Sequence, residues 1–112
     1  MEISVRFHLK YDRAPEIIAK YPKLVEDVVA KAAKDIQQLA QDVYVPVDTG
    51  KLMNSITVTS EGTTGIVTAS ADYAGYVEFG TYKMAAQPYM YPAAKDIEPQ
   101  FIAAMEALHR NL

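Results

Sequence analysis

The 112 residues contain no cysteine. This excludes disulfide bonds, thiolate metal ligands and cysteine nucleophiles, and it suits a reducing cytosol. No apolar run approaches the 18 or so residues that a membrane span needs. The first ten residues alternate between apolar and polar side chains, so no signal peptide is expected. We therefore expect a soluble protein that is made and used in the cytoplasm.

An excess of positive charge is also lacking, because the formal net charge is -3. This balance argues against attraction of the whole chain to nucleic acid or to an anionic membrane. A chain of this length fits one domain, residues 1–112, with a modest hydrophobic core.

The residue patterns of common enzymes are missing. His8 and His109 lie on opposite terminal segments without acidic or histidine neighbours at metal-ligand spacing. Ser55, Ser60 and Ser70 have no nucleophile-elbow glycines around them, and no phosphate-binding or dinucleotide-binding glycine pattern occurs. We predict no catalytic residue, no metal site and no cofactor.

Two arrangements of carboxylates resemble catalytic ones. The triplet Asp48-Thr49-Gly50 is like half of an aspartic-protease site, but that site needs a second carboxylate across a dimer axis. Asp72 and Glu78, six residues apart, could imitate a glycosidase pair. Carboxylates beside a glycine-rich apolar loop more often cap helices or meet an arginine of a neighbouring subunit, and we favour that interpretation.

The first half of the chain predicts a strand and a long helix. Apolar residues alternate from Ile3 to Leu9, which indicates a strand with one buried face. Residues 12–21 form a connector or a short helix. Apolar residues then recur at three- and four-residue steps from Pro22 to Val43, which predicts an amphipathic helix of about twenty residues. Pro46 ends that helix and favours extended backbone at the residue before it.

The next segments predict a short helical turn and a hairpin. Asp48 or Thr49 can cap a turn of helix over residues 51–54, and Gly50 gives backbone freedom there. Residues 56–59 and 66–69 are rich in threonine and β-branched apolar residues, and the turn between them contains glycine, so they predict a β-hairpin.

A last helix is expected from Pro92, with a kink at Pro99 or a start just before Pro99. The predicted fold class is α+β. It consists of a small antiparallel sheet, made from the N-terminal strand and the central hairpin, packed against the long amphipathic helix and the C-terminal helix.

The segment from Asp72 to Pro92 is the least regular part of the chain, with six aromatic residues, two glycines and two prolines. Asp72 is expected to cap a short helix that ends at Gly80, and a bulged strand is the alternative. Residues 81–86 are expected to form a mobile loop, and residues 87–91 an optional edge strand. Tyrosine, methionine and phenylalanine are enriched at interface centres, which favours a protein-binding surface; alternatively, these aromatics complete the core.

Three blocks together resemble the phage tail-component family typified by gene product ten of the lambdoid phage Hong Kong 97. They are Val45-Pro46-Val47-Asp48-Thr49-Gly50-Lys51-Leu52 with Ser55-Ile56, then Tyr73-Ala74-Gly75-Tyr76-Val77-Glu78-Phe79-Gly80-Thr81, then Met84 with Ala86-Gln87-Pro88-Tyr89-Met90-Tyr91-Pro92-Ala93. The structural motif residues of this resemblance are Asp48, Thr49, Gly50, Leu52, Gly80, Gln87 and Pro88.

The resemblance implies a non-enzymatic bacteriophage or prophage protein of the head-tail junction, a tail-completion or tail-terminator subunit. It would act in a homo-oligomeric ring, with six-fold symmetry as one option, joined to other neck or tail proteins. DNA would only pass through its channel, no membrane would be involved, and the protein would be assembled in the bacterial cytoplasm into the virion. The expected interface residues are Tyr73, Tyr76, Glu78, Phe79, Thr81, Tyr82, Lys83 and Met84. The alternatives are a small host adaptor that binds protein without forming rings, or a small hydrolase.

Overall fold

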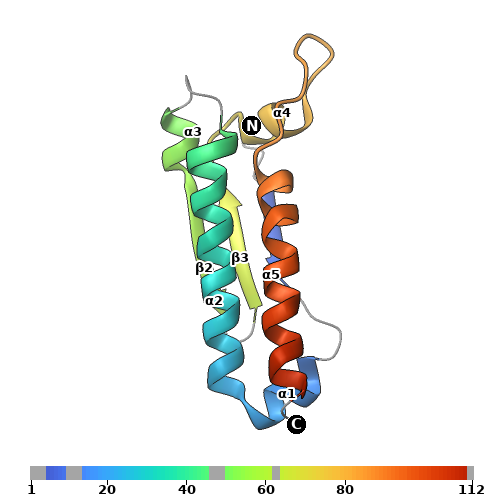
Figure 1. Ribbon diagram of the computed structural model, residues 1–112. Helices are drawn as coiled ribbons and strands as arrows, with labels where there is room; N and C mark the ends of the chain where they lie inside the picture. The colour runs from blue at the N-terminus through green and yellow to red at the C-terminus, as the bar shows by residue number, and fades with distance from the viewer. Residues whose placement is uncertain (1–4, 10–13, 46–49, 62–63, 111–112) are drawn as a thin grey trace.

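The computed structural model describes residues 5–9, 14–45, 50–61 and 64–110 (Figure 1). The elements in chain order are β1 (Val5–Leu9), α1 (Ala14–Lys20), α2 (Pro22–Leu39), the π-helix η1 (Ala40–Tyr44), α3 (Gly50–Asn54), β2 (Ile56–Glu61), β3 (Thr64–Ala69), α4 (Ala74–Phe79) and α5 (Met90–Arg110). This arrangement is the predicted α+β class.

The sheet has three antiparallel strands in the order β1-β3-β2. In this register Val67 of β3 pairs with Phe7 on one side and with Val58 on the other. Burial alternates along β3: Gly65, Val67 and Ala69 are buried, whereas Thr64, Ile66 and Thr68 are only half-buried. The predicted N-terminal strand and central hairpin are therefore confirmed, and β3, the last strand along the chain, is the central strand of the sheet.

One layer of helices covers one face of the sheet. Figure 1 shows α2 and α5 side by side and antiparallel in front of the strands. The buried stripe of α2 follows the predicted helical spacing and consists of Val25, Val29, Ala32, Ala33 and Ile36. Burial of each large apolar side chain contributes about 1.5–3 kcal/mol, so this stripe holds the helix on the sheet. Because the two helices lie side by side along their lengths, the molecule is elongated, with extents of 51 × 22 × 22 Å.

The end of the long helix widens into a π-turn. The backbone N–H of Val45 donates to the carbonyl of Ala40 at 2.8 Å, five residues earlier. Val45 itself is extended, with φ -65° and ψ 131°, as expected for a residue that precedes proline. Two amide side chains tie this end to the hairpin region: Gln37 donates to the carbonyl of Ile56 at 2.8 Å, and Gln41 donates to that of Met53 at 3.0 Å.

Helix α5 starts earlier than predicted, at Met90 and not at Pro92 or near Pro99. It runs for 21 residues and contains Pro99 without ending there. Pro99 is exposed, which places its missing hydrogen bond on the solvent side of the helix. The optional edge strand over residues 87–91 is wrong, because Gln87 and Pro88 are irregular and the helix already starts at Met90.

Candidate functional site

The segment that the sequence marks as irregular lies at one end of the elongated molecule. Figure 1 shows α4 and the turn that follows it beyond the start of α5, projecting past the helix pair. The predicted short helix before Gly80 is confirmed as α4, and the bulged-strand alternative is wrong.

Gly80 makes the sharp exit from α4 possible. Its φ is 77°, in the left-handed region that favours glycine, and its N–H donates to the carbonyl of Tyr76 at 2.8 Å. A Cβ at this position would lie 2.7 Å from the backbone nitrogen of Ala86 and 3.0 Å from the carbonyl oxygen of Met84. Glycine is thus required here by both backbone conformation and space.

Residues 81–84 form a tight turn. The N–H of Thr81 donates to the carbonyl of Met84 at 2.8 Å, and the N–H of Met84 donates back to that of Thr81 at 3.2 Å. The hydroxyl of Thr81 accepts the N–H of Lys83 at 3.2 Å. Beyond the turn, the N–H of Gln87 donates to the carbonyl of Val77 at 2.8 Å, which joins the returning chain to α4. The loop expected from its lack of periodicity therefore has a hydrogen-bonded structure.

Helix α4 and this turn together carry four exposed apolar residues, which we call the aromatic end: Tyr76 and Phe79 of α4, and Tyr82 and Met84 of the turn. Their exposed fractions are 41%, 72%, 94% and 38%. Large apolar side chains grouped in this way, on a backbone held by hydrogen bonds, are typical of a surface that binds a partner. Of the other predicted interface residues, Thr81 and Lys83 are exposed and Tyr73 is half-buried.

Glu78 lies inside the protein instead. It is only 3% exposed, and its carboxylate accepts the backbone N–H groups of Tyr89, Met90 and Tyr91 at 3.2, 2.8 and 3.2 Å. These are N–H groups at the start of α5, which have no partner within their own helix. A carboxylate at a helix N-terminus is also favoured by the helix dipole. Glu78 therefore caps α5, which confirms the interpretation of a capping carboxylate.

Asp72 does not cap α4. The N-cap position is Tyr73, which makes no side-chain capping hydrogen bond, and Asp72 is exposed one residue earlier. The predicted cap is therefore wrong. With Glu78 committed to three backbone donors, the two carboxylates do not form the paired arrangement that a glycosidase needs.

Whereas Tyr76 and Phe79 are exposed, Tyr89 completes the inner side of this end, as the alternative of a core-completing aromatic expected. Its side chain is fully buried, and its hydroxyl donates to the carbonyl of Ala74 at 3.0 Å. Burial, then the negative charge of Glu78 and the neighbouring Tyr73, raise the pKa of Tyr89. The only sequence signal for such a role is its place in a Gln-Pro-Tyr block, and that block does not tell a buried tyrosine from an exposed one.

The block around Asp48 is only partly visible, because Asp48 and Thr49 lie outside the described residues. Gly50 opens α3 without a positive φ, and a Cβ there would meet nothing within 4 Å. The expected need for glycine freedom at this position is therefore wrong. Leu52 is fully buried, and its carbonyl accepts the hydroxyl of Ser55 at 2.7 Å, so this residue of the motif anchors α3 to the core.

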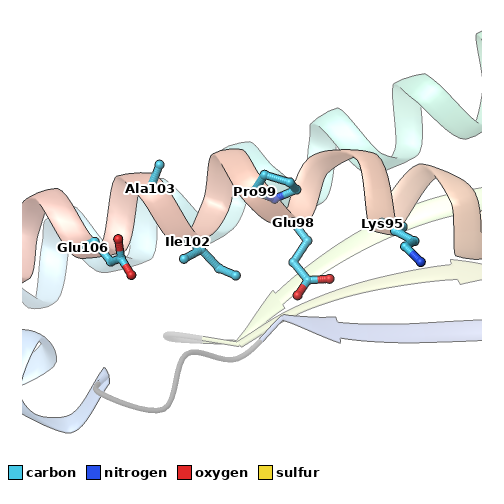
Figure 2. A pocket seen from close by; sticks show the side chains of 6 residues that line it. All are labelled: Lys95, Glu98, Pro99, Ile102, Ala103 and Glu106. Carbon is cyan, nitrogen blue, oxygen red and sulfur yellow. The ribbon is translucent and has the colours of Figure 1, made fainter.

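The surface has several shallow depressions. Figure 2 shows one of about 500 Å³ whose six lining residues all belong to α5, and its charged residues are Lys95, Glu98 and Glu106. Within the described ranges, no group of three or more His, Cys, Asp or Glu side chains could hold a metal ion. His109 lies at the far end, where its Nδ1 is 3.7 Å from Oε2 of Glu16. Among the described helices, none is long and apolar enough to cross a bilayer.

The described residues thus define a small α+β protein with an exposed aromatic surface at one end. The chain belongs to the HK97-gp10-like family of bacteriophage tail components, because the model of that family matches residues 12–80, more than half of the chain. The resemblance noted in the sequence is therefore confirmed. The match includes α4 and ends at Gly80, so the turn and the Gln87-Pro88 pair lie beyond it. No curated protein and no solved structure matched the chain.

Proposed function

We propose that this protein is a structural, non-enzymatic subunit of the phage head-tail junction, a tail-completion or tail-terminator protein that acts in a ring. The observation that carries the proposal is the aromatic end, four exposed apolar side chains held by α4 and a hydrogen-bonded turn on a chain of a tail-component family. Tail assembly depends on contacts between proteins, and an exposed apolar surface of this kind supplies them.

The partners in this proposal are further copies of the chain and neighbouring neck or tail proteins, with the finished ring located in the virion. The whole chain, residues 1–112, would act as one domain of that ring. A ring requires a heterologous interface, in which one surface of a subunit meets a different surface of the next. The net charge of -3 supports a channel through which DNA slides, since like charges do not hold the phosphate backbone.

The proposal is tested with purified protein and the tail-tube protein of the same phage. Light scattering and negative-stain imaging of the chain, alone and with its tail-tube partner, should show ring-shaped assemblies. Phe79→Ala and Tyr82→Ala should lower assembly by about tenfold or more, because aromatic residues are enriched at interface centres and tyrosine is enriched among the few residues whose truncation costs more than about 1 kcal/mol.

The matched control is Leu24→Ala, which truncates an exposed apolar residue near the start of α2. It should leave assembly unchanged, and circular dichroism should show that all three variants fold. Binding to a partner as a single copy, without rings, would favour the adaptor alternative. An inert monomer under every condition would contradict the proposal.

A further inference from the structure

A shallow groove runs between α2 and α5 on the solvent side of the helix pair. Two depressions, of about 370 Å³ and 240 Å³, share Asp35, Ile97 and Gln100 in their walls and so form one continuous feature. At 100° per residue, Asp35 and Asp42 lie on the opposite side of the long helix from Gln37, which contacts β2. The groove therefore faces away from the sheet.

The part of the groove near η1 combines apolar walls with acidic groups. Leu39, Val43 and Ile97 supply the apolar surface, and Val43 is 61% exposed. Asp35 is neutralised by Lys31, whose Nζ lies 2.8 Å from its carboxylate. Asp42 is exposed and forms no ion pair with any residue that the structure describes. One uncompensated acid thus lies beside an uncovered apolar patch.

The aromatic end has the complementary composition. Lys83 is the single charged residue between Phe79 and Tyr91, and its Nζ lies 5.4 Å from the centre of the Tyr82 ring. It also forms no ion pair within the described ranges. The aromatic end therefore presents apolar rings and one positive charge, and the groove presents apolar side chains and one negative charge left unpaired by the described residues, so the two surfaces are complementary.

Within a single molecule the two surfaces are kept apart. The turn is held against α4 by the hydrogen bond from Gln87 to Val77 and by the constrained backbone of Gly80. The turn projects beyond the end of the helix pair (Figure 1). The groove lies between the helices of that pair, as its lining residues on α2, η1 and α5 show. A contact between the aromatic end and the groove would therefore have to form between two copies of the chain.

We propose that the aromatic end of one copy docks into the α2–α5 groove of the next, with Lys83 beside Asp42. The contact is head-to-tail, which is the type that closes into a ring. This inference rests on the proposed ring assembly and names the two surfaces that form it.

Charge exchange tests the pairing of the two residues. Lys83→Asp and Asp42→Lys should each weaken self-association by about tenfold or more, because each places like charges opposite one another. The double variant restores opposite charges and should recover most of the loss. Lys51→Asp, an equal charge change on the exposed surface of α3, is the control and should leave association unchanged. Independent, unrecovered losses in the double variant would overturn the pairing.

The absence of cysteine allows a second test by crosslinking. Ala85→Cys beside the turn combined with Gln38→Cys in the groove should give a ladder of dimers, trimers and larger species with a short bismaleimide. Both positions are exposed, and neither substitution removes an aromatic or charged group of the contact. The control combines Ala85→Cys with Ala103→Cys, an exposed position in the depression of Figure 2, and should give no ladder.

Light scattering of the unmodified chain at the same concentration separates the two hypotheses. Assemblies without the groove-specific ladder would overturn this contact and leave the proposed ring intact. A chain that stays monomeric at millimolar concentration and gives no ladder would contradict both. Equal ladders from the test and control pairs would show that crosslinking comes from random collision, and they would overturn the assignment of the groove.

Discussion

The carboxylate of Glu78 accepts the backbone N–H of Met90 at 2.8 Å, which joins the end of α4 to the first residue of α5. The two residues are twelve apart in sequence, and the aromatic turn lies between them. The same hydrogen bond therefore caps α5 and joins the two chain segments that lead into and out of the turn. One buried side chain thus helps to stabilise α5 and to hold the aromatic end in place.

Glu78→Ala should lower the free energy of unfolding by about 3 kcal/mol, because it leaves several N–H groups at the start of α5 without their charged acceptor. Glu78→Gln keeps one acceptor oxygen and should lose about half as much. Urea denaturation measures both changes. Glu98→Gln, at an exposed position on α5, is the control and should change the free energy of unfolding by less than about 0.5 kcal/mol. Equal effects at the two positions would refute the capping role.

Gly80→Ala and Gly50→Ala should differ sharply although the substitution is the same. At Gly80 the new Cβ meets backbone atoms and the positive φ is strained, so we expect a loss of about 2 kcal/mol or more. At Gly50 there is open space at the start of a helix, so we expect a neutral change or a gain of up to about 1 kcal/mol. Thermal unfolding of the two variants checks this contrast, and a similar loss at both would show that it is wrong.

The protein should lose stability in alkali through Tyr89 and Tyr44. Burial and the charge of Glu78 raise the pKa of Tyr89 above 10.0. The hydrogen bond that Tyr44 donates to Asp96, with burial and the charge of Asp96, raises the pKa of Tyr44. The phenols then ionise in the unfolded chain before they ionise in the folded one. Their contribution is fully present below pH about 10 and is lost as the pH rises from there toward the folded-state pKa.

Urea denaturation between pH about 8 and about 12 tests this dependence. Tyr89→Phe should flatten the alkaline decline, at the cost of about 1–2 kcal/mol at neutral pH because the carbonyl of Ala74 loses a donor. Tyr44→Phe should remove a separate part of the decline. An unchanged decline in the double variant would place its origin in other groups.

Gln37→Ala should lower the free energy of unfolding by about 1–2 kcal/mol. Its amide donates to the carbonyl of Ile56 at 2.8 Å, and the loss leaves that partly buried acceptor at the start of β2 without its donor. The adjacent Gln38 is exposed and supplies a matched control, Gln38→Ala, with an expected change below about 0.5 kcal/mol. Chemical denaturation compares them, and indistinguishable values would contradict a stabilising tie between α2 and β2.

The elements that sequence predicts well are those governed by neighbours along the chain. The apolar stripe of α2 was visible at its three- and four-residue spacing, and the extended geometry of Val45 followed from Pro46 in the sequence. The end of α4 at Gly80 could also be predicted, because the residue that follows a helix often has a positive φ and is then most often glycine. Local sterics determine each of these features.

The features that sequence could not predict depend on groups brought together by folding. For Glu78 the sequence indicated either a helix cap or an interface residue, and it did not indicate that the capped helix begins eleven to thirteen positions later. Tyr82 and Tyr89 are chemically identical, yet one is 94% exposed and the other fully buried. Gly50 and Gly80 are equally permissive residues, and only at Gly80 would an added Cβ meet backbone atoms within 3.1 Å.

By itself, then, the sequence determined the α+β class, the long amphipathic helix, the hairpin and the family. The fold class, the helix and the hairpin follow from periodicity and from local backbone constraints, which act within a few residues. The family follows from the resemblance of the sequence blocks and from the match of the family model. Tertiary structure alone decided which aromatics face solvent, which carboxylate caps α5 and where a groove opens between α2 and α5. Burial and long-range hydrogen bonding set these outcomes, and neither is encoded in the spacing of any single segment.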